Sequence, residues 1–289
     1  MTENERYLFD INGYIVVPEV LSIKEVSEAN RAIDNHFDEI QERTGDLSLS
    51  GVSSTLKGIA GRGDLGGMLT WEKPWCDPFR AMLIHPRVAP YVQALLGLGF
   101  RMDHRPSLIT MREGTEGHVF HGGSGPEFDP RQYYIVRNGR MHNGLTVVAW
   151  QLADQDEGDG GLCVIPGSHK GNFACPEAIR NFEAHHEFIK QITAKAGDVV
   201  IFSEATTHGT LPWRAKHERR SLLFRYSPNC LAYSNSYLSW PEGTLDGLTS
   251  EQRAILEPPY HKEFRENKYN IPQTRDRPMV DYGEALTKE

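Results

Sequence analysis

Residues 145–169 read LTVVAWQLADQDEGDGGLCVIPGSH and contain two short apolar runs separated by an acidic, glycine-rich turn. Similar runs at 108–111, 199–202 and 222–226 are also short and rich in β-branched or aromatic residues. Several short strands at such spacing favour a sandwich or barrel over alternating strand–helix units. This part of the chain therefore predicts a mainly β core, from about residue 100 to about residue 230.

The first hundred residues are expected to be mainly helical. Ser22 and Glu25 have the spacing of a capping box, and apolar residues follow at three- and four-residue intervals over 26–40. A second helical stretch starts at Asp77-Pro78, with proline in the first turn. We therefore expect one domain over 1–289, with a helical part (about 1–99), the β core (about 100–230) and a C-terminal lid or tail (about 231–289).

Composition excludes several classes of partner. The formal net charge of −8 argues against a nucleic-acid polymer, which needs a basic face, and fits poorly with binding to anionic lipid. No run approaches the roughly 18 apolar residues of a membrane span, and the polar N-terminus does not read as a secretory signal. The four cysteines form no C-x-x-C pair. We therefore expect a cytoplasmic protein with reduced thiols and a small-molecule partner; the sequence does not indicate an oligomeric state.

Two of the 12 histidines stand in contexts that suit metal binding. His121 follows an expected strand and precedes Gly122-Gly123, and His208 lies just beyond the expected strand 199–202. Imidazole is a good ligand for iron, copper, nickel and zinc, so both histidines are candidate metal ligands. A lone histidine in either place would more often be structural. The metal-binding interpretation therefore needs support from a further residue.

Arg219 supplies that support. It comes 11 positions after His208 and opens an apolar strand, in which alternation places Arg219 and Ser221 on one face and Arg220 on the other. An arginine directed into a barrel is costly unless it meets an anion. A guanidinium with a hydroxyl beside it is a good receptor for a carboxylate. A surface position on an edge strand remains the alternative, more attractive for Arg220 than for Arg219.

Together these pieces resemble the phytanoyl-CoA dioxygenase family of iron/2-oxoglutarate oxygenases. The resemblance covers roughly residues 8–230 and is strongest from 145 onward, in the order and spacing of several segments. These segments are WQLAD (150–154), GDGGLCVIPGSH (158–169), AGDVVIF (196–202), THG (207–209) and the stretch from Arg219 to Pro228.

The family fold is a double-stranded β-helix, or jelly roll, with helices packed against one sheet. The resemblance implies that His121 and His208 bind Fe(II) and that Arg219, assisted by Ser221, binds the distal carboxylate of 2-oxoglutarate. We expect His118 to lie near bound 2-oxoglutarate and Trp150 to line the pocket, with core packing as the alternative for Trp150. We interpret His169, in the Pro-Gly-Ser-His turn, as structural.

The sequence departs from the family pattern at Gly123. The facial triad has two histidines and one carboxylate, and the carboxylate normally stands two residues after the first histidine, where this chain has a glycine. Iron/2-oxoglutarate halogenases have His-x-Gly or His-x-Ala at this motif, and chloride takes the vacant position. The leading interpretation is therefore a halogenase that uses O2 and chloride, with the chloride beside Gly123. It would chlorinate an unactivated aliphatic carbon by hydrogen abstraction and chloride rebound.

Two alternatives remain open. The chain could be a hydroxylase whose iron site is completed by water or by a carboxylate from elsewhere, such as Glu127 or Asp129. It could also be a homologue that binds a ligand without turnover. Gly122-Gly123 could be present for backbone reasons, because glycine reaches positive φ freely. That requirement would not explain why both histidines and the Arg-x-Ser pair are present.

Information on the substrate is limited to charge and aromatic content. Several arginines near the expected mouth could face an anionic small molecule, such as a nucleotide, although each is more often an ordinary solvated residue: Arg101, Arg105, Arg112, Arg131, Arg137 and Arg140. The C-terminal segment is aromatic enough to close over the site and exclude water. Its aromatic residues include Tyr233, Tyr237, Trp240 and Tyr260.

Overall fold

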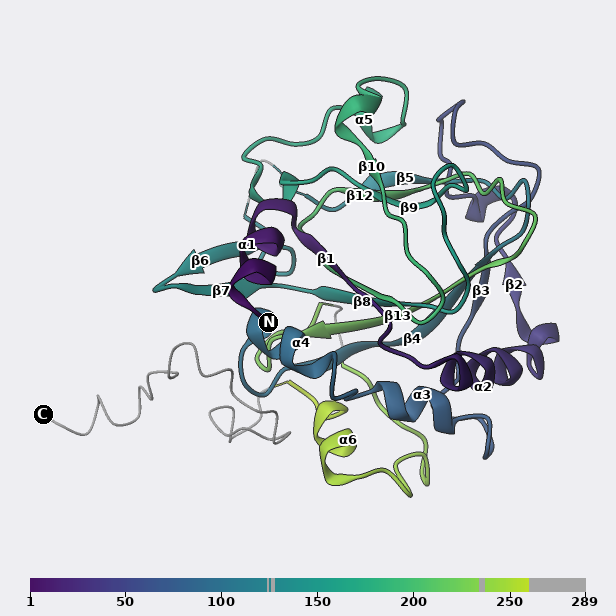
Figure 1. Cartoon of the computed structure of the whole chain (residues 1–289), viewed down its shortest axis with the longest axis vertical. Coiled ribbons are helices and arrows are strands. Elements are labelled where there is room, and N and C mark those ends of the chain that lie inside the picture. The colour runs from purple at the N-terminus through teal and green to yellow at the C-terminus, as the bar shows by residue number, and fades with distance from the viewer. Residues whose placement is uncertain (124, 126–127, 234–236, 260–289) are drawn as a thin grey trace, which may run out of the picture.

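A computed structural model describes residues 1–123, 125, 128–233 and 237–259. Its main feature is a pair of facing β-sheets with helices on the outer side of the larger one (Figure 1). The expected fold, mainly β with flanking helices in a double-stranded β-helix or jelly roll, is confirmed. No helix among the described residues is long and apolar enough to cross a bilayer.

The larger sheet has seven strands among the described residues, and its core strands are the apolar runs of the sequence. In spatial order they are β1 (Tyr14–Val17), β11 (Val199–Ser203), β8 (Thr146–Gln151), β13 (Arg219–Ser227), β4 (Arg101–Met111), β3 (Gly63–Leu65) and β2 (Gln41–Glu42). Three of these strands come from the first hundred residues. The N-terminal part is therefore not only helical, because it supplies both edges of this sheet.

The smaller sheet carries the candidate metal ligands. In spatial order its strands are β10 (Lys190–Gln191), β9 (Gly161–Val164), β12 (His208–Leu211) and β5 (His118–His121). A separate hairpin is formed by β6 (Tyr134–Arg137) and β7 (Arg140–Asn143). Because β5 and β12 pair directly, the sheet brings together residues that are 87 positions apart, with His121 opposite His208.

Some of the helices begin at capping signals in the sequence. Ser22 and Glu25 form the expected capping box, and Thr249 and Gln252 form another. The stretch starting at Asp77 gives two helices, with the residues around Pro86 between them. The α-helices are α1 (Glu3–Asn12), α2 (Ile23–Asp34), α3 (Asp77–Met82), α4 (Ala89–Leu96), α5 (Glu177–Arg180) and α6 (Ser250–Ile255).

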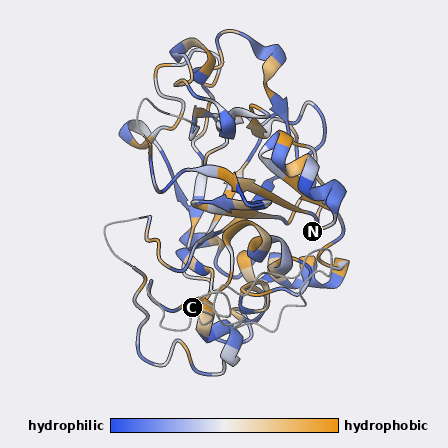
Figure 2. Cartoon of the chain, turned by 90° about the vertical axis from the view of Figure 1, so that its left-hand side faces the viewer, coloured by the Kyte–Doolittle hydropathy of each residue, from blue (hydrophilic) through white to orange (hydrophobic). Residues whose placement is uncertain are grey.

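Alternation along β8 and β13 divides the interior into two apolar layers. On the outer face, Trp150, Leu222 and Phe224 join the core that packs against the helices. On the inner face, Val147 and Ala149 join a smaller core between the two sheets. Figure 2 shows this arrangement as hydrophobic strands through the middle of the molecule. The smaller inner core leaves space for polar side chains at one end, where the candidate site lies.

Candidate active site

Three side chains that can bind a metal ion converge between the two sheets. They are His121 at the end of β5, His208 at the start of β12, and Glu204 immediately after β11. One ligand atom from each lies within 4.8 Å of the others, and the Nε2 atom of His208 is 3.9 Å from Oε1 of Glu204. His208 and Glu204 are buried, so this cluster differs from the exposed acidic groups common on protein surfaces.

The ring of each histidine is oriented by a contact with a backbone carbonyl. The Nδ1 atom of His121 is 3.1 Å from the carbonyl oxygen of Val119, and that of His208 is 2.7 Å from the carbonyl oxygen of Thr206. If each Nδ1–H donates to its carbonyl, Nε2 is left as the free ligand atom. Burial, reinforced by the charge of His208, lowers the pKa of His121 to about 4. His121 is therefore neutral near pH 7, as a metal ligand must be.

Gly122 and Gly123 have a backbone reason to be glycine. Their φ angles are +71° and +81°, in the left-handed region that side chains disfavour. A Cβ atom at Gly123 would approach the Oγ1 atom of Thr207 closer than 3.0 Å, and a Cβ atom at Gly122 would meet the carbonyl oxygens of Glu204 and Thr206. An aspartate at position 123 would therefore not fit this loop without rearrangement, whether or not the position is used by a ligand.

Glu204 is a candidate ligand that we did not expect from the sequence. Of the two carboxylates suggested instead, Asp129 pairs with Arg131 at 2.9 Å and is not in the cluster, and Glu127 lies outside the described residues. Two signals in the sequence could have found Glu204. It stands four residues before His208, and it is an acidic residue almost directly after the apolar run 199–202.

Arg219 lies on the inner face of β13, as alternation predicts, and is only 3% exposed. Its Nε donates to Oε1 of Gln155 at 2.9 Å, and its Nη1 contacts the sulfur of Met111 at 3.5 Å. Gln155 and Met111 are both neutral, and burial lowers the pKa of Arg219 to about 10. A buried cation with neutral partners is a receptor for an anion. Ser221, on the same face, accepts a hydrogen bond from Nε2 of Gln151.

His118 lies beside the metal ligands, whereas Trp150 does not. The rings of His118 and His121 are 4.3 Å apart, and burial lowers the pKa of His118 to about 2. Trp150 points to the opposite face of the sheet, where its ring contacts His85 and Phe224. The pocket-lining role expected for Trp150 therefore gives way to core packing, because its strand neighbour Gln151 is the residue that faces inward. His169 contacts the backbone of Asp10 at 3.0 Å, in keeping with a structural role.

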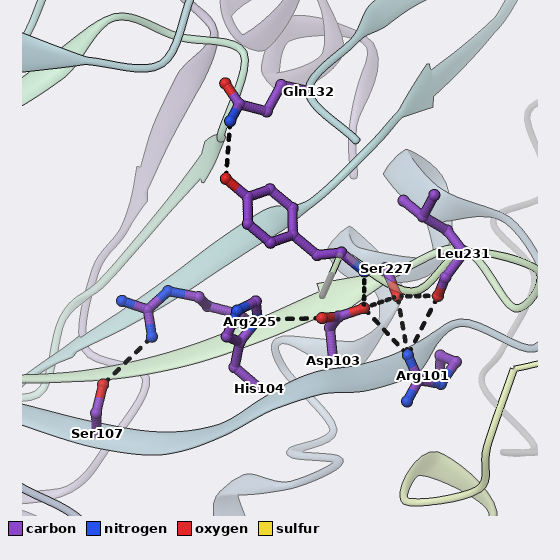
Figure 3. Close-up of polar contacts among 9 residues, drawn as sticks. Arg101, Asp103, His104, Ser107, Gln132, Arg225, Ser227 and Leu231 are labelled. Carbon is purple, nitrogen blue, oxygen red and sulfur yellow. Dashed lines mark hydrogen bonds and ion pairs between the residues drawn. The ribbon is translucent and has the colours of Figure 1, made fainter. Parts of the chain in front are cut away.

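A buried polar cluster fastens the start of the C-terminal segment to the core (Figure 3). Nη1 of Arg101 lies 3.1 Å from Oδ2 of Asp103, and the Asp103 carboxylate accepts hydrogen bonds from Oγ of Ser227 and from the backbone N–H of Tyr233. The hydroxyl of Tyr233 accepts a hydrogen bond from Gln132 at 2.8 Å. Tyr233 is therefore fixed at both ends, and its charge interaction with Glu204 places it near the candidate metal ligands.

The other residues expected at the mouth have varied positions. Arg105 lies over the ring of Trp240, and Arg112 pairs with Glu42 at the surface. Arg137 and Arg140 face each other across the β6–β7 hairpin. Tyr237 is exposed, and Tyr260 lies outside the described residues. Of the expected lid residues, Tyr233 is the one with a demonstrated relation to the site.

The donor set fits iron. Two imidazoles and one carboxylate, with room for further ligands, are the facial triad of non-haem iron oxygenases. Bonds of about 2.1 Å at right angles would separate neighbouring donor atoms by about 3 Å. The described side chains are more open than this, so they would close by roughly 1–2 Å around an ion.

The comparisons with known proteins agree with this chemistry. The family model of phytanoyl-CoA dioxygenase (PhyH) matches residues 9–221, which is most of the chain. No curated protein sequence matches the chain significantly.

Several solved structures share the fold at low sequence identity. HygX from Streptomyces hygroscopicus, solved with nickel and 2-oxoglutarate, has a TM-score of 0.65 and 19% identity over 86% of this chain and 94% of its own. The 2-oxoglutarate-dependent carbocyclase SnoK from nogalamycin biosynthesis has a TM-score of 0.57 and 15% identity over 91% and 95%. The epimerase SnoN from the same biosynthesis has a TM-score of 0.56 and 18% identity over 85% and 89%. With the family match over 9–221 and the arrangement of His121, His208 and Arg219, the chain belongs to the phytanoyl-CoA dioxygenase family of iron/2-oxoglutarate-dependent enzymes.

Proposed function

We propose that this enzyme is an iron/2-oxoglutarate oxygenase whose iron site is completed by Glu204 instead of a carboxylate at position 123. The observation that carries the proposal is the convergence of His121, Glu204 and His208, with ligand atoms within 4.8 Å of one another. This is the hydroxylase alternative of the sequence, with a different carboxylate. Its substrate is a small molecule with an aliphatic C–H bond.

Each residue of the site has a definite task in this proposal. His121, His208 and Glu204 bind the ion, and the backbone carbonyls of Val119 and Thr206 keep both imidazoles oriented. Arg219 pairs with the distal carboxylate of 2-oxoglutarate. When bound, iron with 2-oxoglutarate and O2 supplies the oxidising power that breaks an aliphatic C–H bond.

Burial of the site serves the same chemistry. His208 and Arg219 are only 6% and 3% exposed, so few water molecules can reach them. In this proposal Tyr233, which is held by Asp103 and Gln132 and lies close enough to Glu204 for their charges to interact, helps to keep water out. Exclusion of water protects reactive species from side reactions.

A matched pair of carboxylate-to-amide variants tests the iron ligands. Glu204→Gln removes the proposed ligand charge, whereas Asp129→Asn alters the carboxylate that the sequence suggested and that pairs with Arg131. Loss of one buried charge partner weakens binding by at least about 2 kcal/mol, or roughly 30-fold. We expect this loss of Fe(II) affinity in Glu204→Gln alone, measured by anaerobic titration. Equal affinities in Glu204→Gln and the wild type would remove Glu204 from the site.

Chlorination is the second candidate function, and the absence of a side-chain ligand at Gly123 favours it. Glu204 weakens this alternative because it offers the negative ligand that chloride would otherwise provide. Anomalous scattering from crystals soaked in bromide distinguishes the two. A halide bonded to iron beside Gly123 would support the halogenase, and a Glu204 oxygen about 2.1 Å from iron without halide would support the oxygenase.

A further inference from the structure

A second arginine faces the candidate active site and has no assigned task. Arg225 lies on β13 six residues after Arg219, and alternation puts both on the inner face with Ser221. The sequence offered this signal, since the same alternation that selects Arg219 also selects Arg225. Six strand residues separate the two arginines by about 20 Å along the strand, so they reach different parts of the interior.

Arg225 lies at the end of the interior that holds the metal ligands. Glu204 and Tyr233 both act on its charge, and Arg225 in turn helps lower the pKa of His121. The backbone connections agree, because Glu204 donates its N–H to Leu145, which precedes β8, and the start of β8 pairs with β13 at Arg225 and Tyr226. Arg219 lies towards the other end, near Gln155.

The guanidinium of Arg225 is poorly satisfied by the described residues. Its one hydrogen bond is from Nη1 to the hydroxyl of Ser107, at 3.2 Å (Figure 3), although a guanidinium has five N–H donors. No described carboxylate lies within the 4.0 Å of an ion pair. Its neighbour Arg220, on the opposite face, instead pairs with Asp34 and Glu218. The inner arginine is therefore the one that lacks a direct counter-ion.

The charge balance of the loaded site leaves Arg225 free to bind an anion. Without metal, Glu204 is the negative charge that acts most strongly on Arg225. Once Glu204 binds a divalent ion, that ion offsets the negative charge of Glu204, and the distal carboxylate of 2-oxoglutarate pairs with Arg219. Arg62 adds further positive charge on this side, although Asp64 partly offsets it. An anionic group beside Arg225 would offset this positive charge.

We infer that Arg225 binds an anionic group, a carboxylate or a phosphate, of the substrate and so positions its C–H bond at the metal. This inference rests on the proposed function and adds a substrate class to it. Tyr233, whose hydroxyl accepts the hydrogen bond from Gln132, lies close enough to Arg225 for their charges to interact. Arg225 is only partly exposed and lies on the inner face of β13, so the anion would bind on the side of the sheet that carries the metal ligands.

The test uses enzyme loaded anaerobically with Ni(II) and 2-oxoglutarate, titrated calorimetrically with acetate and with methyl phosphate. We expect one of the two probes to bind, and the stronger one identifies the anion as carboxylate or phosphate. Arg225→Gln should weaken that probe by at least about 30-fold, and Arg225→Lys should retain part of the affinity because it keeps the charge. Arg220→Gln, on the opposite face of the same strand, should bind as the wild type does.

Separate measurements distinguish the two proposals. The visible charge-transfer band of Fe(II) with 2-oxoglutarate should form in the wild type and in Arg225→Gln, which also shows that the variant is folded. Absence of the band in the wild type would count against the proposed function. If the band is normal but the wild type binds neither probe, or binds the probe no better than Arg225→Gln does, the role of Arg225 is refuted and the proposed function is not.

Discussion

Replacing Gly123 by alanine should destabilise the enzyme even without metal. Alanine at a φ of +81° costs about 1–2 kcal/mol. Its Cβ atom would also press on the Oγ1 atom of Thr207. Thr207 cannot easily retreat, because its N–H donates to Ser168 and its carbonyl accepts from Ile165. Overpacking of this kind adds about 1–3 kcal/mol. The expected loss is therefore about 2–5 kcal/mol of unfolding free energy.

A double-mutant cycle separates the two contributions. Thr207→Ala removes Oγ1, so Gly123→Ala made in that background should lose only the φ contribution of about 1–2 kcal/mol. Urea unfolding of the four metal-free proteins measures these differences. A Gly123→Ala enzyme within 0.5 kcal/mol of the wild type would refute a backbone requirement at this position. It would also return weight to the halide interpretation.

The same geometry changes how a Gly123→Asp variant should be interpreted. Aspartate has the same Cβ atom, which would clash with Thr207, so its carboxylate could not be placed at the iron without a shift of the loop. Loss of activity in this variant would follow from misplacement of the loop under either function. Restored stability in Gly123→Asp with Thr207→Ala would make the comparison of products informative.

Three further predictions concern the cofactor, pH and the core. Arg219→Lys should weaken 2-oxoglutarate binding by roughly 10-fold or more, because lysine lacks the bidentate fork of arginine, and Ser221→Ala should have a smaller effect. Titration of the charge-transfer band measures both affinities. An unchanged affinity in Arg219→Lys would contradict the role assigned to Arg219. Between pH 6.5 and 5, the metal-free protein should lose stability, because the unfolded chain binds protons at the usual histidine pKa of 6.5 whereas His118 and His121 have pKa values of about 2 and 4 in the fold. The loss should be roughly 2 kcal/mol per histidine, and a flat profile in urea unfolding would contradict it. Trp150→Phe should reduce unfolding free energy by about 1–3 kcal/mol and leave 2-oxoglutarate affinity unchanged, since the ring packs outside the site.

Most of the β core could be predicted from the sequence because its strands are buried on both faces. Runs such as 199–202 are continuously apolar, and glycine-rich turns mark their ends. Strands β2 and β3 could not be found in this way, because they are two and three residues long and polar in part. The position of β3 depends on pairing with β4, which lies far along the chain, and β2 in turn pairs with β3.

His121, His208 and Arg219 could be named as candidates from their local contexts and the family resemblance, whereas Glu204 could not, because its place beside His121 depends on contact between the two sheets. Glu204 follows the large sheet and His121 ends a strand of the small one. No local spacing relates positions 121 and 204. Trp150 was expected to line the pocket, with core packing as the alternative, and it lies in the core. Ser221 pairs with Gln151, so the inward phase of β8 falls on Gln151 and excludes its neighbour.

The pairing of His121 with His208 has a consequence for the small sheet itself. β5 is the edge strand of that sheet, and its pairing with β12 is irregular between His208 and Thr210. An ion bound by one histidine from each strand would link β5 to β12 and so stabilise the edge of the sheet. Occupancy and strand closure then become linked equilibria, so that each favours the other. Amide protons of β5 should exchange with solvent more slowly when the metal is bound, so their exchange rates report metal loading at this edge of the sheet.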